Sequence, residues 1–454
     1  MLPVAVAAGH PATVAAGIEI LEDGGTAADA AVAAALASCV AETIMTGLLG
    51  GGHAIYWDGR TALNLDCFVD VPSGVGAPPV ELHVPFGEEL VHYAVGPGTC
   101  AVPGLPAGLG ALHTRFGRLP WVRLVQPALE LAQSGVTIPP AHASCLAMLA
   151  PVFTLTEAGR AIYAPAGDPL ESGDPLEQPG LVAALELLAE EGVRSVYRGT
   201  LAEVLLGAVD GVGISRDDLE RYEARWTDPV QIAYAASRFL TRGELSGVPE
   251  ALGRLPRLGA LEHTERVLAL LAVLEEPGSE GHTTNLVVAD GDGAVCVLTS
   301  SLGLGTGDFL PGYDLHLNSM LGEIDLVRAP HAAGERMQSM MAPSIALDSR
   351  GVVLAIGSAG GTRLRTALVG VAAGILDEAL EPVDAVARPR FHPVGSLVNA
   401  EPGVDEDALS QLERAGRDVR RWPAQHHYFG GVSAIGRRGA AGDPRRSGHA
   451  ALLS

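Results

Sequence analysis

The most informative stretch of this chain is GHTTNLVVAD, residues 281–290. Two threonines, Thr283 and Thr284, open an apolar run that ends at Ala289, and an Asp-Gly-Asp-Gly turn follows. A second apolar run covers residues 294–298. Two such runs joined by Asp and Gly residues predict a β-hairpin. A Thr pair at the start of a strand is by itself ordinary β-propensity, so its meaning depends on the rest of the chain.

The composition is that of a globular, strongly acidic protein. The 454 residues are enough for one large or two moderate domains, and 48% of them are hydrophobic, which provides a sizeable core. The formal net charge is -23, and all 30 basic residues are arginines. An acidic chain repels nucleic acid and anionic membranes, so neither is expected as a partner. Without lysine, Schiff-base chemistry and a Walker-type phosphate site are excluded.

Cysteine spacing and the N-terminal sequence favour a cytoplasmic protein. Five cysteines, at positions 39, 67, 100, 145 and 296, show no paired spacing, so neither disulfides nor a metal site are predicted. Residues 1–17 lack the basic region of a signal peptide. The long alanine-rich stretches carry Asp29 and Glu42, so no membrane span is expected. The pair His426–His427 has no third ligand at useful spacing, and we expect neither a metal nor a cofactor.

Two further segments have a clear local pattern. Residues 27–40 predict a buried, alanine-rich helix with Thr26 as its N-cap and Asp29 as a buried structural acid. Residues 71–104 are rich in Gly and Pro and are expected to form a connection. Strands and helices alternate again from residue 284 to about residue 380.

Short motifs are spread along the whole chain: AGHP (8–11), GGTAADAAVA (24–33), GGG (50–52), VPG (102–104) with FGRLPW (116–121) and QPA (126–128), GSAGGTR (357–363), PRFH (389–392) and DPRR (443–446). In sequence and in order they resemble the motifs of γ-glutamyltranspeptidases. Each motif alone is weak, but their shared order over residues 8–446 is strong support for the resemblance.

The resemblance implies a self-cleaving N-terminal-nucleophile hydrolase. Its fold would be α+β, a four-layer αββα sandwich formed jointly by two fragments. Cleavage between His282 and Thr283 would give a large fragment, 1–282, and a small fragment, 283–454, with Thr283 as nucleophile. The fragments would form a heterodimer, and whether this heterodimer dimerises further is left open.

The implied chemistry needs few side chains. The α-amine of Thr283 can serve as general base for its own hydroxyl group. Gly360 and Gly361 take the family's oxyanion-hole position, because a Gly-Gly turn exposes backbone N–H groups. Ser301 resembles the family hydroxyl that hydrogen-bonds the nucleophile and assists self-cleavage, with Thr299 as the alternative if the alignment slips.

The positions that bind the glutamyl group in the family are changed here. Phe68 stands at the place of the Arg that holds the α-carboxylate, and an apolar ring cannot bind a carboxylate. Gly303 replaces an Asn that binds the α-amino group, and Ser339-Met340 replaces a Ser-Ser pair. The family's Gln and Asp fall near Met320 and Glu323. We therefore expect a small-molecule substrate other than glutathione.

Four functions stay open from the sequence. The first is amide hydrolysis of a non-glutathione compound, with a role in secondary metabolism. The second is hydrolytic C–C cleavage, as in the actinobacterial pathways to 4-alkylproline antibiotic precursors, in which family relatives are implicated. The third is ordinary γ-glutamyl hydrolysis or transfer, with Arg336 or Arg365 binding the carboxylate. The fourth is a pseudoenzyme that keeps the fold without turnover.

Overall fold

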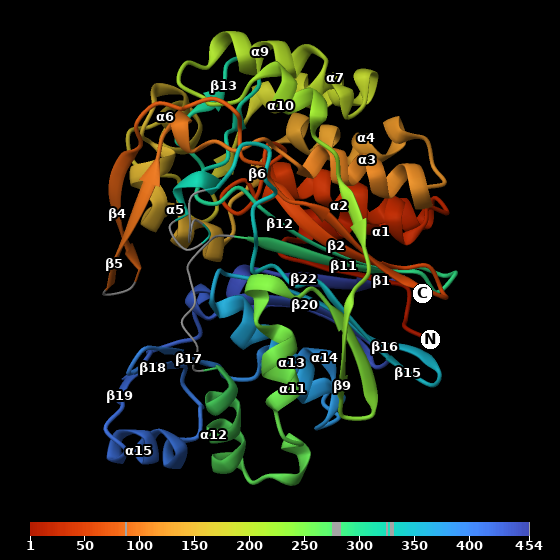
Figure 1. Ribbon diagram of the computed structural model, residues 1–454, viewed down its shortest axis with the longest axis vertical. Coiled ribbons are helices and arrows are strands. Elements are labelled where there is room, and N and C mark those ends of the chain that lie inside the picture. The colour runs from red at the N-terminus through yellow and green to blue at the C-terminus, as the bar shows by residue number, and fades with distance from the viewer. Residues whose placement is uncertain (87–88, 275–282, 324–325, 327–330, 454) are drawn as a thin grey trace.

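The computed structural model describes residues 1–86, 89–274, 283–323, 326 and 331–453. Two β-sheets lie face to face, and helices cover the outer face of each, which gives four layers (Figure 1). His282, the residue expected before the cleaved bond, lies outside the described residues. The predicted four-layer α+β architecture is confirmed.

The first sheet has seven strands, and all neighbouring strands in it are antiparallel. In spatial order they are β22 (His449–Leu452), β1 (Ala5–Ala8), β11 (Thr284–Ala289), β12 (Val295–Ser301), β2 (Gly51–Trp57), β3 (Ala62–Cys67) and β8 (Arg225–Thr227). The strands β11 and β12 are the predicted hairpin, with Val287 opposite Val297. Strand β11 therefore begins directly after Thr283, and the neighbouring strand β12 ends next to it.

The second sheet has six antiparallel strands. They are β21 (Gly439–Gly442), β20 (Gly431–Gly436), β16 (Gly351–Ala359), β15 (Ser344–Asp348), β10 (Ser237–Thr241) and β9 (Val230–Tyr234). Alternate apolar residues of the two sheets, such as Val287 and Val297 on one and Ile345 and Ile435 on the other, pack between them. This inner layer of the core excludes water from the middle of the sandwich.

Small side chains let the helices approach the first sheet closely. Its outer helices are α1 (Pro11–Glu22), α2 (Ala27–Ala41), α3 (Leu105–Phe116), α4 (Trp121–Ser134) and α7 (Pro179–Glu191). Every residue of α2 is buried. Its N-cap is Thr26, and the Oδ2 atom of Asp29 accepts hydrogen bonds from the backbone of Thr26, Arg118 and Leu119. Both predictions for this helix are therefore confirmed.

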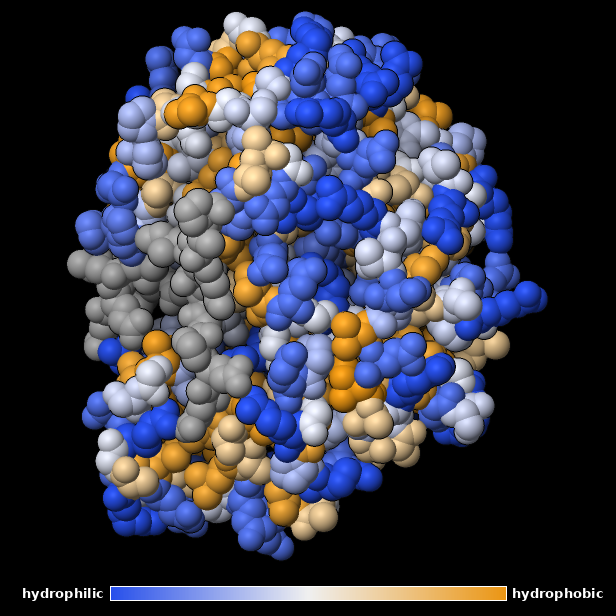
Figure 2. Space-filling model, viewed as in Figure 1, coloured by the Kyte–Doolittle hydropathy of each residue, from blue (hydrophilic) through white to orange (hydrophobic). Residues whose placement is uncertain are grey.

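The second sheet carries α11 (Val248–Arg254), α12 (His263–Leu274), α13 (Arg363–Leu376) and α14 (Pro382–Ala387). Further elements surround the sandwich: α5 (Pro140–Phe153), α6 (Glu157–Tyr163), α8 (Arg194–Tyr197), α9 (Thr200–Ala208), α10 (Arg216–Arg221), α15 (Glu406–Arg414), and β17 (Phe391–Val394), β18 (Leu397–Ala400) and β19 (Asp418–Arg421). Hydrophilic residues cover most of the face seen in Figure 2, with apolar patches between them. None of the helices in the described ranges is long and apolar enough to cross a membrane.

The expectation of a plain connection over residues 71–104 is wrong. Two strands, β4 (Val80–Phe86) and β5 (Glu89–Val95), form an antiparallel hairpin there, which projects at the side of the molecule (Figure 1). Apolar residues alternate along β4 at Val80, Leu82 and Val84, and this period of two was the signal for a strand.

Candidate active site

Thr283 lies directly before β11 and lines a pocket at the end of the first sheet. Its side chain is 5% exposed. The other lining residues in the described part of the chain are Phe68, Ser301, Gly303, Met320, Glu323, Leu326, Ser339, Met340, Met341, Gly361 and Leu364. The pocket therefore gathers the expected nucleophile, one of the two oxyanion glycines and every expected substrate-binding residue.

The strand register favours Ser301 over Thr299 as the hydroxyl beside Thr283. Thr284 pairs with Ser300 across β11 and β12, so Thr283 comes opposite Ser301 when the same register is continued by one residue. Ser301 Oγ accepts a hydrogen bond from the backbone of Gly303 at 2.9 Å. Thr299 instead faces Asn285 in the ladder and is not among the residues that line the pocket.

Gly360 and Gly361 form the turn between β16 and α13, and both have positive φ values, +121° and +58°. A Cβ atom on Gly360 would lie 2.9 Å from the Cα of Gly430 and 3.0 Å from Nη2 of Arg446, so only glycine fits there. The turn precedes the N-terminus of α13, where the helix dipole favours negative charge. This location suits the stabilisation of an oxyanion.

His392 of the PRFH motif holds the start of α13. Its Nδ1 atom lies 2.9 Å from Oγ1 of Thr366, and its Nε2 atom lies 3.3 Å from Oγ1 of Thr362. Burial holds the pKa of His392 well below its ordinary value, so the ring is neutral, with one nitrogen as donor and the other as acceptor. The ring therefore fixes the helix turn that follows the two glycines.

Most of the pocket wall is apolar. Phe68 is 1% exposed, and its ring stacks on the ring of His53 with centroids 5.5 Å apart. Of the described lining residues, Glu323 alone carries an ionisable side chain. No group of three or more His, Cys, Asp or Glu side chains within the described ranges could hold a metal ion.

Comparison with known proteins identifies the family. The model of the gamma-glutamyltranspeptidase family matches residues 13–255 and 260–453. This chain belongs to the γ-glutamyltranspeptidase family. It is a divergent member and, with the fold described above, a hydrolase of the N-terminal-nucleophile class.

Similar proteins include both acylases and glutathione hydrolases. The acylase ACY 1 proenzyme of Pseudomonas sp. (strain SE83) is 27% identical over 507 residues, which cover 95% of this chain and 89% of that protein. The glutathione hydrolase proenzyme of Bacillus subtilis (strain 168) is 26% identical over 541 residues, which cover 96% and 90%. The solved cephalosporin acylase from Bacillus halodurans shares the fold, with a TM-score of 0.84 and 22% identity over 100% of this chain and 96% of that chain.

The two arginines considered as substitutes for the family's carboxylate-binding Arg are engaged elsewhere. Arg336 donates to Asp66 at 2.8 Å and to Asp70 at 2.5 Å, and its guanidinium lies over the ring of Tyr222. Arg365 donates to the backbone oxygen of Leu274 at the end of α12. Both arginines are described by the structure, and neither lines the pocket.

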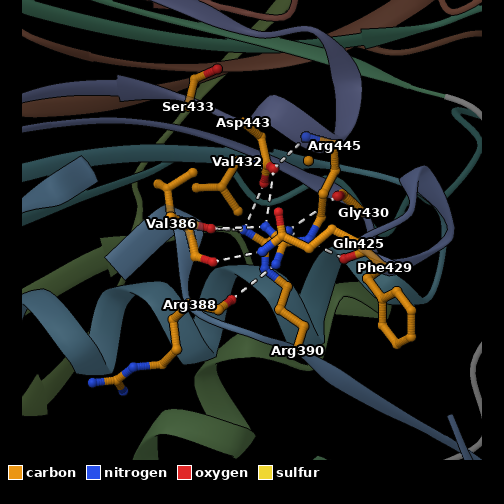
Figure 3. A network of polar contacts seen from close by, with 12 residues as sticks. Val386, Arg388, Arg390, Gln425, Phe429, Gly430, Val432, Ser433, Asp443 and Arg445 are labelled. Carbon is orange, nitrogen blue, oxygen red and sulfur yellow. Dashed lines mark hydrogen bonds and ion pairs between the residues drawn. The ribbon is translucent and has the colours of Figure 1, made fainter. Parts of the chain in front are cut away.

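The family's DPRR motif forms the short helix η6 (Pro444–Arg446), and a buried polar network holds it (Figure 3). Asp443 accepts hydrogen bonds from the backbone of Val432 and Arg445 and forms an ion pair with Arg390 at 2.6 Å. Arg445 pairs with Glu401 at 2.5 Å, and neither of these two side chains is exposed. This network fixes the position of the next residue, Arg446.

Arg446 and Glu42 lie beside Thr283, away from the pocket described above. The sequence analysis did not predict either residue as part of the site. Arg446 Nη1 donates to the backbone oxygen of Thr283 at 3.4 Å. Glu42 lines a second, polar cavity together with Thr283, Thr284 and Arg446. The DPRR motif entered the sequence analysis only as part of the resemblance, and no spacing rule connects Glu42 with residues more than 240 positions later in the sequence.

Proposed function

We propose that this chain matures by cleaving itself before Thr283, and that the new N-terminal threonine then hydrolyses an acyl compound without the charged head group of glutathione. One observation carries the proposal. The pocket that contains Thr283 also contains Ser301 and Gly361, whereas Phe68 and Met340 replace the polar groups that would hold a glutamyl head group. Membership in the family and the proenzyme names of its relatives support processing into two fragments.

Self-cleavage would proceed by an N-to-O acyl shift. The Thr283 hydroxyl attacks the carbonyl carbon of residue 282, the C–N bond breaks, and the hydroxyl proton passes to the departing nitrogen. The product is an ester on Thr283 with a free α-amine. Water then opens the ester, which leaves a carboxyl group on residue 282 and a free hydroxyl on Thr283. Ser301 is the side chain closest in register to assist this step.

Turnover would use the same atoms. The α-amine accepts the hydroxyl proton while the hydroxyl attacks the substrate carbonyl, which gives an acyl-enzyme that water hydrolyses. Backbone N–H groups of the Gly360–Gly361 turn would stabilise the tetrahedral oxyanion. Their location at the N-terminus of α13 adds a favourable helix dipole.

The pocket favours an apolar or neutral acyl group. A free α-carboxylate would meet Phe68, Met340 and the carboxyl group of Glu323, and no cation among the described lining residues. Each missing charged hydrogen bond is worth about 1.5–3 kcal/mol. Three missing anchors therefore reduce the preference for a γ-glutamyl group by about 4.5 kcal/mol or more, which is about a thousandfold.

The apolar wall of the pocket that contains Thr283 also favours a second candidate function, hydrolytic C–C cleavage of a keto compound. Thr283 would attack the ketone carbonyl, and the C–C bond would break with its electron pair leaving on a carbon stabilised as an enol or enamine. A protonated form of that fragment departs, and water releases the acyl group from Thr283. This reaction needs the oxyanion turn and an apolar pocket but no glutamyl-binding residue.

The nucleophile is tested by the size of the purified protein on a denaturing gel. The wild-type chain should run as two fragments, residues 1–282 and 283–454, and Thr283→Ala should run as one chain. Edman sequencing of the smaller wild-type fragment should begin Thr-Thr-Asn. An active wild-type protein that stays in one piece would disprove the proposal and equally the use of Thr283 as an N-terminal nucleophile.

The substrate is tested with two matched anilides. γ-Glutamyl anilide and butanoyl anilide share the acyl carbons and differ in the amino and carboxyl groups, so their kcat/KM ratio isolates the head group. We expect the butanoyl compound to be cleaved at least as efficiently. A strong preference for the γ-glutamyl anilide at micromolar KM would show that the pocket binds a glutamyl group after all. Mass spectrometry with a vinylogous keto compound distinguishes C–C from amide cleavage.

A further inference from the structure

Glu42 is a buried acid directly beside the start of the small fragment. It follows the last residue of α2 and is 1% exposed. Thr13 donates to its Oε1 atom at 2.7 Å, and Thr284 donates to its Oε2 atom at 2.5 Å. A Cβ atom on Gly9 would lie 2.4 Å from that Oε2 atom, so the glycine leaves room for the carboxyl group. These contacts hold the Glu42 carboxyl group against Thr284, the residue that follows Thr283.

The carboxyl group has two hydroxyl donors but no ion pair with a described residue. Arg446, the cation in the same cavity, donates to the backbone oxygen of Thr283 and to the sulfur of Met45. A buried carboxylate is costly unless a positive charge compensates it. Arg446 attracts the Glu42 carboxylate without a direct ion pair, and self-cleavage adds a second positive charge, because the amide nitrogen of Thr283 becomes an amine that can bind a proton.

We propose that Glu42 is the counter-ion of the α-amine that cleavage creates on Thr283, and that it promotes self-cleavage by stabilising this charge. The inference rests on the proposed function, since only a cleaved chain has this amine. Glu42 does not touch the substrate pocket, so it acts as a positioning residue and not as a catalytic one.

The pKa of the Glu42 carboxyl group suits its role as the counter-ion of the Thr283 α-amine. Burial raises its pKa to about 7, while the hydroxyl groups of Thr284 and Thr13, and Arg446, act in the opposite direction. An unperturbed α-amine has a pKa of about 8. A nearby ammonium group favours the ionised carboxyl, and a nearby carboxylate favours the ammonium form of the amine. The pair therefore titrates as a unit near neutral pH.

The neighbouring groups do not compete for this proton. The titratable and charged groups around Glu42 are Cys39, Arg446, Asp443, His142 and His10. Burial raises the pKa of Cys39 to about 12 and lowers the pKa of His142 to about 3 and that of His10 to about 4. These three groups are neutral between pH 5 and pH 9, and Asp443 is paired with Arg390.

The first test measures the rate of self-cleavage after cell-free synthesis of the full chain, followed on a denaturing gel. Glu42→Gln removes the charge and keeps the shape, and we expect the 283–454 fragment to form at least tenfold more slowly. Two controls keep the charge: Thr13→Val removes one hydroxyl donor, and Glu42→Asp shortens the side chain. Both should process faster than Glu42→Gln, and Thr13→Val should stay within about threefold of wild type.

The second test measures kcat/KM against pH for protein that has finished processing, with butanoyl anilide as probe. Removal of the carboxylate lowers the pKa of the amine, so the neutral amine persists to lower pH. The acidic limb of the Glu42→Gln profile should therefore move down by about one pH unit relative to wild type. A merely structural role would lower the rate without moving this limb.

Three results overturn the inference. In the first, Glu42→Gln cleaves itself at the wild-type rate and the acidic limb of its pH profile does not move. In the second, Thr13→Val cleaves itself as slowly as Glu42→Gln, and in the third, Glu42→Asp cleaves itself no faster than Glu42→Gln. Thermal unfolding of Thr283→Ala, with and without Glu42→Gln, shows whether the fold tolerates the loss of the carboxylate. If the Glu42→Gln chain does not fold, the self-cleavage rates of Glu42→Asp and Thr13→Val test the inference. The proposed function fails separately, when Thr283→Ala is still cut at the same bond.

Discussion

Substitution of Gly360 by alanine tests whether the turn before α13 is the oxyanion hole. Gly360 has a φ of +121°, and a Cβ atom would lie 2.9 Å from the backbone of Gly430 and 3.0 Å from Arg446. The backbone must rotate to relieve both the contact and the positive φ, a strain of about 1–3 kcal/mol. This rotation turns the neighbouring N–H groups away from the pocket that contains Thr283 and Gly361.

The expected loss is that of one oxyanion donor. Such a loss costs about 2.7–4 kcal/mol of transition-state stabilisation, which lowers kcat by about 10²–10³. The donor acts mainly on the transition state, so KM should change little. The assay is steady-state hydrolysis of butanoyl anilide by the processed fraction of Gly360→Ala, normalised to the amount of the 283–454 fragment.

Gly370→Ala is the matched control. Gly370 lies inside the same helix, α13, and an added Cβ atom there would meet nothing within 4 Å. Alanine in a helix interior is favoured over glycine by about 1 kcal/mol, so this variant should unfold at a slightly higher temperature and keep its kcat. A Gly360→Ala enzyme with wild-type kcat would refute the assignment of the oxyanion hole to this turn.

Three further predictions concern self-cleavage, stability and specificity. Ser301→Ala should slow self-cleavage on a denaturing gel, whereas Thr299→Val should not, because the strand register brings Ser301 and not Thr299 opposite Thr283; equal rates would contradict this. In an uncut Thr283→Ala background, Glu401→Gln should lower the free energy of unfolding by about 1.5–3 kcal/mol in denaturant, since it removes the nearer of the two carboxylates paired with the buried Arg445 and leaves Asp443, at 3.2 Å. The exposed pair of Glu413 and Arg421 offers a control, and Glu413→Gln should leave the unfolding midpoint nearly unchanged. Phe68→Arg combined with Met340→Ser should raise the γ-glutamyl to butanoyl kcat/KM ratio at least tenfold, because one charged hydrogen bond is worth about 1.5–3 kcal/mol; an unchanged ratio would place the head group elsewhere.

The sequence was sufficient to predict the architecture. The hairpin at 284–301 follows from two apolar runs and an Asp-Gly turn, and α2 follows from a capped alanine-rich stretch. Phe68, Gly303, Glu323, Ser339 and Met340 come from separate parts of the chain and line one pocket, and the resemblance to the family's glutamyl-binding positions singled them out. Local pattern alone could not have done so. Their part in substrate binding stays a prediction.

What escaped prediction depends on contacts between distant segments. Glu42 was noted only because it interrupts an apolar stretch, and its contact with Thr284 requires the C-terminal end of α2 to meet the start of β11. The β4–β5 hairpin was missed for a different reason. Its Gly- and Pro-rich flanks concealed the alternating pattern of a strand that begins at Val80.

The arrangement of the site explains how a family member can keep its reaction and change its substrate. Thr283 directly precedes β11, and Ser301 ends the paired strand β12. Asn285 of β11 accepts a hydrogen bond from Ser433 of the second sheet, which ties the strand that follows the proposed nucleophile to the other half of the sandwich. Phe68, Met320 and Met340 lie outside the strands of both sheets. Substitution at these positions alters the pocket wall without disturbing the ladder that holds Thr283. The proposed nucleophile and the proposed oxyanion turn are therefore constrained by the fold itself, whereas the pocket wall can change to fit a different acyl group.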